Sequence, residues 1–207
     1  CRRICDIKKL SDGTDFVYVG NATTTFTDYE NGVLVEDYTG GILLKNAKLG
    51  DNGISKMKFG AKITNIKGKY SSSTTNVMSS IIVEDVNIDD IIEEDNSNSF
   101  VCRSTDINEI IAFYDKYLEG SALVINNPEI QKKNDGGYAI TFTSYSGGSD
   151  KPTIVELPAI LKGDIDFTKN QIVGYARKFD GVLTFVIVGN DVPKQPVNVE
   201  FVENSNF

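Results

Sequence analysis

The sequence predicts an all-β protein built from two tandem copies of one five-stranded module. Three observations support this prediction. Short stretches rich in Val, Ile, Thr, Tyr and Phe, many alternating with polar residues, fill nearly the whole chain after its first dozen residues. The 207 residues give room for two domains of about 100 residues each. Short motifs of the first half recur in the same order in the second half.

The first half is predicted to hold five strands, which span residues 15–27, 31–38, 41–45, 59–70 and 75–88. The pairs Asn31-Gly32 and Gly40-Gly41 mark turns between them, because these residues adopt turn conformations at little cost. An acidic and then Asn/Ser-rich stretch over residues 89–99 has the composition of a linker. We therefore expect the first module to occupy residues 1–98.

The second module is predicted over residues 99–192, with strands at 121–131, 137–145, 153–161, 168–178 and 181–189. One short helix, residues 106–118, opens it. Asp106 is a suitable N-cap, Glu109 completes a capping-box-like start, and apolar residues recur at helical spacing behind them. The tail, residues 193–207, contains an alternating segment that forms either an added strand or the start of a further domain.

The internal repeat is carried by matched motifs. Cys1-Arg2 and Asp6-Ile7 recur as Cys102-Arg103 and Asp106-Ile107. Residues 31–35 match 136–140, the Gly pair 40–41 matches 147–148, and Phe59, Ile63 and Tyr70 match Phe167, Ile172 and Phe179. Because turns and strands correspond in order, both halves are predicted to share one architecture.

The residue types present argue against catalysis. Histidine is absent, which removes the usual general base and the partner of Ser and Cys nucleophiles. The acidic pairs Glu36-Asp37 and Glu84-Asp85 are neighbours on predicted strands, so their side chains point to opposite faces. We therefore expect a protein that is not an enzyme. The net charge of −8 disfavours nucleic acid as a partner, although seven lysines lie between Lys45 and Lys69.

Three cysteines, Cys1, Cys5 and Cys102, lack the spacing and the additional ligands of a zinc site. No cofactor or metal is predicted. Cys1 is either the lipidated residue of a mature lipoprotein or the start of one repeat in a longer protein, since Cys1-Arg2 has an internal counterpart. A lipid at Cys1 is the only membrane attachment that we expect.

The strings GVLVEDYTGGILL (residues 32–44), FGAKITNIKGKY (59–70) and SIIVEDV (80–86) resemble the OB-like modules of surface and secreted Bacteroidetes proteins. The resemblance is close over residues 6–88 and looser over 106–192. It implies two five-stranded OB-like barrels and an extracytoplasmic setting, at the bacterial outer membrane surface or in the periplasm. These modules are largely of unknown function, so the resemblance implies no activity.

OB barrels bind ligands over their second and third strands and the adjoining loops, where aromatic rings stack on bases or sugars. The candidate binding residues are Tyr29 and Tyr38, with Lys45 and Lys69 as cationic neighbours, in the first module, and Tyr145 in the second. Tyr138 and Phe142 share one strand face with Ile140 and are assigned to the core.

Three functional classes compete. The acidic linker and the repeated modules favour a spacer or protein-interaction unit, whose partners are other protein domains. A glycan-binding module, with surface glycans as partners, is the second hypothesis. Single-stranded nucleic-acid binding through the OB face is the third, and the acidic balance of the chain weighs against it.

Overall fold

The computed structural model describes residues 1–28, 32–45, 59–72, 80–85, 91–92, 119–144, 153–179 and 181–193, with Val199 and Phe201. Strands dominate these residues, and the single helix among them is the short α1 (Ile4–Ile7). The all-β prediction is therefore confirmed. The helix predicted over residues 106–118 lies outside the described residues.

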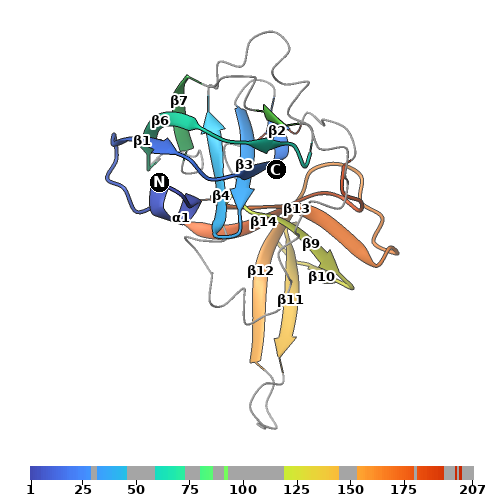
Figure 1. Cartoon of the computed structure of the whole chain (residues 1–207). Coiled ribbons are helices and arrows are strands. Elements are labelled where there is room, and N and C mark those ends of the chain that lie inside the picture. Colours follow the sequence, from blue (N-terminus) through green and yellow to red (C-terminus); the bar gives the residue numbers. More distant parts are fainter. Residues whose placement is uncertain are drawn as a thin grey trace.

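The first half of the chain forms one sheet of eight strands (Figure 1). Its strands are β1 (Asp15–Tyr18), β2 (Ala22–Asp28), β3 (Gly32–Asp37), β4 (Gly40–Lys45), β5 (Lys62–Ile63), β6 (Ile66–Ser71), β7 (Ser80–Asp85) and β8 (Ile91–Ile92). They are ordered β1-β6-β7-β4-β3-β2-β5-β8.

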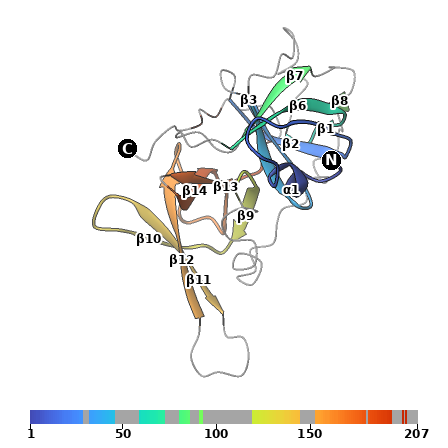
Figure 2. The same ribbon diagram turned by 90° about the vertical axis from the view of Figure 1, so that its left-hand side faces the viewer.

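The second half forms a separate sheet of six strands. These are β9 (Ala122–Asn126), β10 (Glu129–Lys132), β11 (Tyr138–Ser144), β12 (Thr153–Leu161), β13 (Gln171–Phe179) and β14 (Val182–Gly189). Their order is β10-β11-β12-β14-β13-β9. The hairpin of β11 and β12 projects away from the rest of the molecule in both views (Figures 1 and 2).

The two sheets share one topology once β5 and β8 are set aside. Reading β9-β13-β14-β12-β11-β10 beside β1-β6-β7-β4-β3-β2 gives the same succession of strands. In both halves one pair, β4 with β7 and β12 with β14, is parallel, and the other neighbours are antiparallel. The outer strands β1 and β2 are consecutive in the chain, as are β9 and β10. Each sheet therefore curls into a barrel-like shape.

The predicted first strand of each half is broken in the structure. In the first half the break lies at Gly20, where an added Cβ would come within 2.5 Å of the Arg2 carbonyl oxygen. In the second half it lies at Asn127-Pro128, where Asn127 has φ 49° and Pro128 offers no N–H to a ladder. The predicted strand over residues 59–70 is likewise divided into β5 and β6 next to Asn65, which has φ 55°.

The register aligns the two halves residue by residue. Leu44 and Ala159 are equivalent, because they pair with the matching residues Ile81 of β7 and Phe185 of β14. Val33 pairs with Leu44 as Tyr138 pairs with Ala159, so the register of the described residues 32–35 agrees with the predicted match to residues 137–140. Equivalent bulges stand before Gly68 and Gly174, in β6 and β13. The bulges make Ile66 the counterpart of Ile172. The predicted match of Ile63 with Ile172 is therefore wrong by three residues, because β5 has no counterpart in the second half.

Each half has its own buried core. In the first half, Ile4 and Ile7 of α1 close the core formed by inward-facing residues such as Val35, Ile42 and Tyr70. In the second half the core is formed by residues that include Ile140, Phe142, Leu157, Ile172 and Phe185. Tyr138 packs against this second core, as predicted, and Phe142 belongs to it.

Candidate functional site

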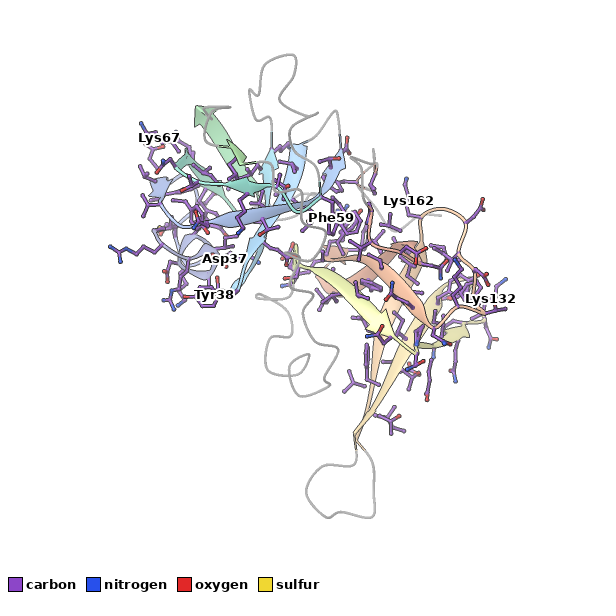
Figure 3. All side chains as sticks on the ribbon, turned by 45° about the vertical axis from the view of Figure 1, so that its right-hand side comes forward. Asp37, Tyr38, Phe59, Lys67, Lys132 and Lys162 are labelled. Atoms are coloured by element: carbon purple, nitrogen blue, oxygen red, sulfur yellow. The ribbon has the colours of Figure 1, made fainter. Side chains whose placement is uncertain are left out.

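The three predicted binding residues that the structure describes do not all lie together. Lys45 and Lys69 share one row of the first sheet, because both pair in register with Ile82 of β7, whereas Tyr38 lies at the opposite end of β4. Tyr29 and Tyr145 lie outside the described residues. Tyr38 is 80% exposed in the turn that joins β3 to β4 (Figure 3), whereas Lys45 is partly buried at the far end of β4. Lys69 lies on β6 and its Nζ is 3.8 Å from an Asp15 carboxylate oxygen.

The outer face of β3 and β4 is covered by the second half of the chain. Leu34 and Leu43 point away from the first core and are fully buried. They share a third apolar cluster with Phe26 of β2 and with residues of the second half, namely Ala122, Val173, Tyr175, Phe179 and Val186. Figure 3 shows Phe59 between the two halves, and its ring meets that of Phe26 edge-on with centroids 5.3 Å apart. This interface core joins the two sheets.

The two backbones also touch directly at the interface. A Cβ on Gly41 would lie 2.1 Å from the carbonyl oxygen of Gly120, and one on Gly120 would lie 2.8 Å from the Gly41 carbonyl group. Real Cβ atoms do not approach other atoms so closely, so both positions require glycine. Nearby, the buried Lys8 ammonium donates to the Glu119 carbonyl oxygen at 2.7 Å.

The C-terminal tail reaches the same interface. Val199 and Phe201 are buried in the interface core, and the Phe201 ring packs edge-on against Tyr175 at 5.5 Å. The Val199 N–H donates to the Thr27 carbonyl oxygen and the Phe201 N–H donates to Asp28 Oδ2, both at 2.8 Å. These residues of the tail therefore contact both halves.

Charged groups are sealed within this interface region. Arg177 is 1% exposed with its guanidinium carbon 4.3 Å from the centre of the Phe179 ring, and Asp28 is 3% exposed. Burial raises the pKa of the Tyr175 hydroxyl, the Asp28 charge raises it further, and the Arg177 charge opposes both. Because these side chains are closed to solvent, their contribution is to packing and orientation rather than to contact with a ligand.

Asp37 ties helix α1 to the hairpin of β3 and β4. Its Oδ2 accepts from the Ile4 N–H at 2.8 Å and from the Tyr18 hydroxyl at 3.1 Å. Its Oδ1 accepts from the Thr39 N–H and hydroxyl, and the Thr39 hydroxyl oxygen accepts from the Cys5 N–H. Burial and the Asp37 carboxylate together raise the pKa of the Tyr18 hydroxyl. Sequence reasoning missed this role, since the partners of Asp37 lie up to 33 residues away.

A second exposed aromatic ring lies in the second half, at a residue that sequence reasoning did not propose for binding. Phe167 is 52% exposed in the loop between β12 and β13, and it stacks on Tyr138. It was matched with Phe59, but Phe59 packs in the interface core, so the two rings are not equivalent. The spacing of Asp166 and Thr168 is the signal that could have identified a turn here rather than a strand.

Metal and membrane sites were also considered within the described residues. No group of three or more His, Cys, Asp or Glu side chains there could hold a metal ion. The acidic side chains of residues 89–95 lie outside the described part of the chain. Of the two cysteines described, Cys1 is exposed and Cys5 is buried, and both are free thiols. No helix in the described ranges is long and apolar enough to span a membrane.

Comparison with known proteins identifies no relative. No protein-family model matches the chain, and no curated protein or solved structure is significantly similar to it.

Proposed function

We propose that the chain is a non-catalytic, extracytoplasmic unit of two OB-like barrels that acts as a rigid spacer or protein-interaction unit. The observation that carries this proposal is the interface core, in which Leu34 and Leu43 of the first sheet pack against Tyr175 of the second. Such a core fixes the two barrels relative to each other, as a spacer requires.

The strand order supports the OB assignment. When β1 and β2 count as one bent first strand, the first sheet runs as strands 1-2-3-5-4 and returns to strand 1. Strands 3 and 5, which are β4 and β7, are parallel in that arrangement. The second sheet follows the same scheme with β9 and β10 as its first strand. This succession is the one expected for a five-stranded OB barrel.

The buried face supports a structural role for the first barrel. OB barrels present ligands to the outer face of strands 2 and 3, which are β3 and β4 here. Leu34 and Leu43 on that face are each 0% exposed because the second barrel covers them. Each fully buried Leu contributes about 1.5–3 kcal/mol of apolar stabilisation. A ligand could reach this face only if the barrels separated, and the apolar stabilisation from Leu34, Leu43 and their neighbours in the interface core would then be lost.

Single-molecule energy transfer between the barrels tests the rigidity. The labels belong on Lys67→Cys and Lys132→Cys, which lie on opposite sides of the molecule (Figure 3), with Cys1→Ser, Cys5→Ala and Cys102→Ser in the background. We expect one narrow transfer peak. Leu43→Ser should broaden it, and Val182→Ser, at a residue 51% exposed, should leave it unchanged. A broad peak in the unaltered interface would contradict a rigid spacer.

A binding survey tests the proposal against nucleic-acid binding. We expect no retention of single-stranded oligonucleotides at physiological salt, because phosphate contacts require a cationic surface. If an oligonucleotide binds at physiological salt and is released when Lys62, Lys67 and Lys69 are replaced by Gln, the protein is a nucleic-acid-binding OB pair. A generic glycosidase screen, with hydrolysis as the contrary result, tests the absence of catalysis.

A further inference from the structure

Phe167 presents an aromatic ring to solvent at one end of the second barrel. Its ring is 52% exposed, and the other side stacks nearly parallel on Tyr138, with centroids 5.9 Å apart and an interplanar angle of 19°. Phe167 is not among the residues of the second core or among those packed against it. The ring therefore contributes little to the packing of the second core.

The loop that carries Phe167 is held by hydrogen bonds on both sides of it. Asp166 Oδ1 accepts from the Thr168 N–H at 2.9 Å and from its hydroxyl at 2.6 Å, which lowers the pKa of the Asp166 carboxyl. The Asn190 side chain accepts from the Asp166 N–H and donates to the carbonyl oxygens of Asp166 and Gln171. The ring is thus positioned before any ligand arrives, which reduces the entropic cost of binding.

The groups around the ring favour a neutral ligand. Lys133 is paired with Glu156 at 3.0 Å and Lys169 with Asp191 at 3.8 Å, so these two cations are already balanced. Lys132 is a further exposed cation at this end of the barrel, but the exposed carboxyl groups of Asp135 and Asp166 lie at the same end, so the surroundings of the ring carry no net positive charge. A base would stack on the ring equally well, but a nucleotide also needs unpaired cations for its phosphate. A sugar needs an apolar ring face and uncharged hydrogen-bonding groups beside it.

Such groups come from the neighbouring turn. Tyr138 pairs in register with Lys132, which is exposed and lies at the far end of the second half in Figure 3. The turn between β10 and β11 follows Lys132 and exposes Asn134 and Asp135 at the same end of the barrel. Asp135 fixes this turn by accepting from the Gly137 N–H at 2.9 Å.

We propose that Phe167 is the stacking platform of a glycan-binding site for a neutral oligosaccharide. Tyr138 supports the ring from below, and the turn at Asn134 supplies polar groups beside the sugar. The site lies away from the interface core and adds a ligand to a unit whose main role is structural. The two proposals are independent, because the spacer role needs no ligand.

Affinity electrophoresis through gels that contain β-glucan, β-mannan, xylan or α-glucan tests the site. We expect at least one polysaccharide to retard the protein equally at low and high salt, since stacking is insensitive to screening. Phe167→Ala should weaken binding about tenfold, the equivalent of the ~1.4 kcal/mol within reach of one aromatic contact. Phe167→Trp should preserve it.

Two controls separate stacking from other causes. Phe167→Leu keeps an apolar side chain but removes the flat ring, so it should weaken binding as Phe167→Ala does. Tyr38→Ala removes the strongly exposed ring that the structure describes in the first half, and should have no effect on binding. Circular dichroism checks that each variant is folded. Retardation by none of the four polysaccharides, or equal retardation of Phe167→Ala and the unaltered protein, would overturn the proposal.

Discussion

Strands β6 and β13 hold the same place in the two barrels but face different surroundings. The shared bulge makes Lys67 the counterpart of Val173 and Lys69 the counterpart of Tyr175. Lys67 is exposed and Lys69 is partly exposed, whereas Val173 and Tyr175 are buried in the interface core. Equivalent backbone positions thus lie at the surface in the first half and in the interface in the second half.

The inward faces of the same strands remain alike. Ile66 and Tyr70 belong to the first core, and their counterparts Ile172 and Ala176 belong to the second. Between these two strands, the difference in burial is therefore confined to the outer face. The requirement to fill a barrel core determines which residues occupy the inward face of these strands. The contact between the two barrels determines which residues occupy the outward face.

The largest effect is expected at Tyr175. Tyr175→Ala should lower the free energy of unfolding by about 3–5 kcal/mol, because it removes a buried ring from the centre of the interface core. Lys69→Ala, at the equivalent position, should change it by less than about 0.5 kcal/mol, since Lys69 has only a surface ion pair. Urea unfolding measures both values. Similar losses for the two variants would show that the outer faces do not differ as described.

The contrast between inward and outward faces also explains which parts of the fold could be predicted from the sequence. Alternation and turn residues predicted the strands well, because each barrel core depends on local inward patterns such as Val33, Val35 and Ile42. The interface was not predicted, since Leu34 and Leu43 look like ordinary members of continuous apolar strands. Only a partner surface distant in sequence distinguishes them from core residues.

The candidate site was harder to predict for a related reason. The binding face was inferred from an isolated barrel, but β3 and β4 are covered by the second barrel. Of the five residues proposed, Lys45 and Lys69 lie in one row of the first sheet, Tyr38 lies apart from them in the turn before β4, and Tyr29 and Tyr145 are outside the described residues. Phe167 was not proposed as a binding residue, because the repeat was aligned three residues out of register and matched it with Phe59.

A smaller loss is expected where the two backbones touch. Gly41→Ala should destabilise the protein by about 1–3 kcal/mol, because its Cβ would overlap the Gly120 carbonyl and force the barrels apart. Gly189→Ala is the matched control in β14, where an added Cβ meets nothing within 4 Å. Thermal unfolding followed by circular dichroism compares the two. Equal melting temperatures for both variants would argue against close docking.

The two equivalent hairpins differ in how they are held, which leads to a third prediction. Asp37→Ala should cost about 1–2 kcal/mol, because the Ile4 N–H at the start of α1 and the Tyr18 hydroxyl lose an acceptor. Phe142, its counterpart by register, ties the second hairpin to no helix among the described residues. Asp135→Ala, which removes a single exposed hydrogen bond, is the control and should have little effect on urea unfolding.

The smallest effect has the opposite sign and concerns the Tyr175 hydroxyl. Its oxygen is buried without a hydrogen-bond partner among the described residues, although the ring packs against Phe26 and Phe201. A buried hydroxyl that gives up its water contacts without replacement is destabilising, so Tyr175→Phe should keep the packing and raise stability by up to about 1 kcal/mol. Tyr70→Phe is the control. The Tyr70 hydroxyl donates to the Lys8 carbonyl oxygen at 3.5 Å, so removing it should not raise the stability. If Tyr175→Phe is instead less stable than the unaltered protein in urea, the hydroxyl has a partner, and the interface is more polar at its centre than its apolar cluster indicates.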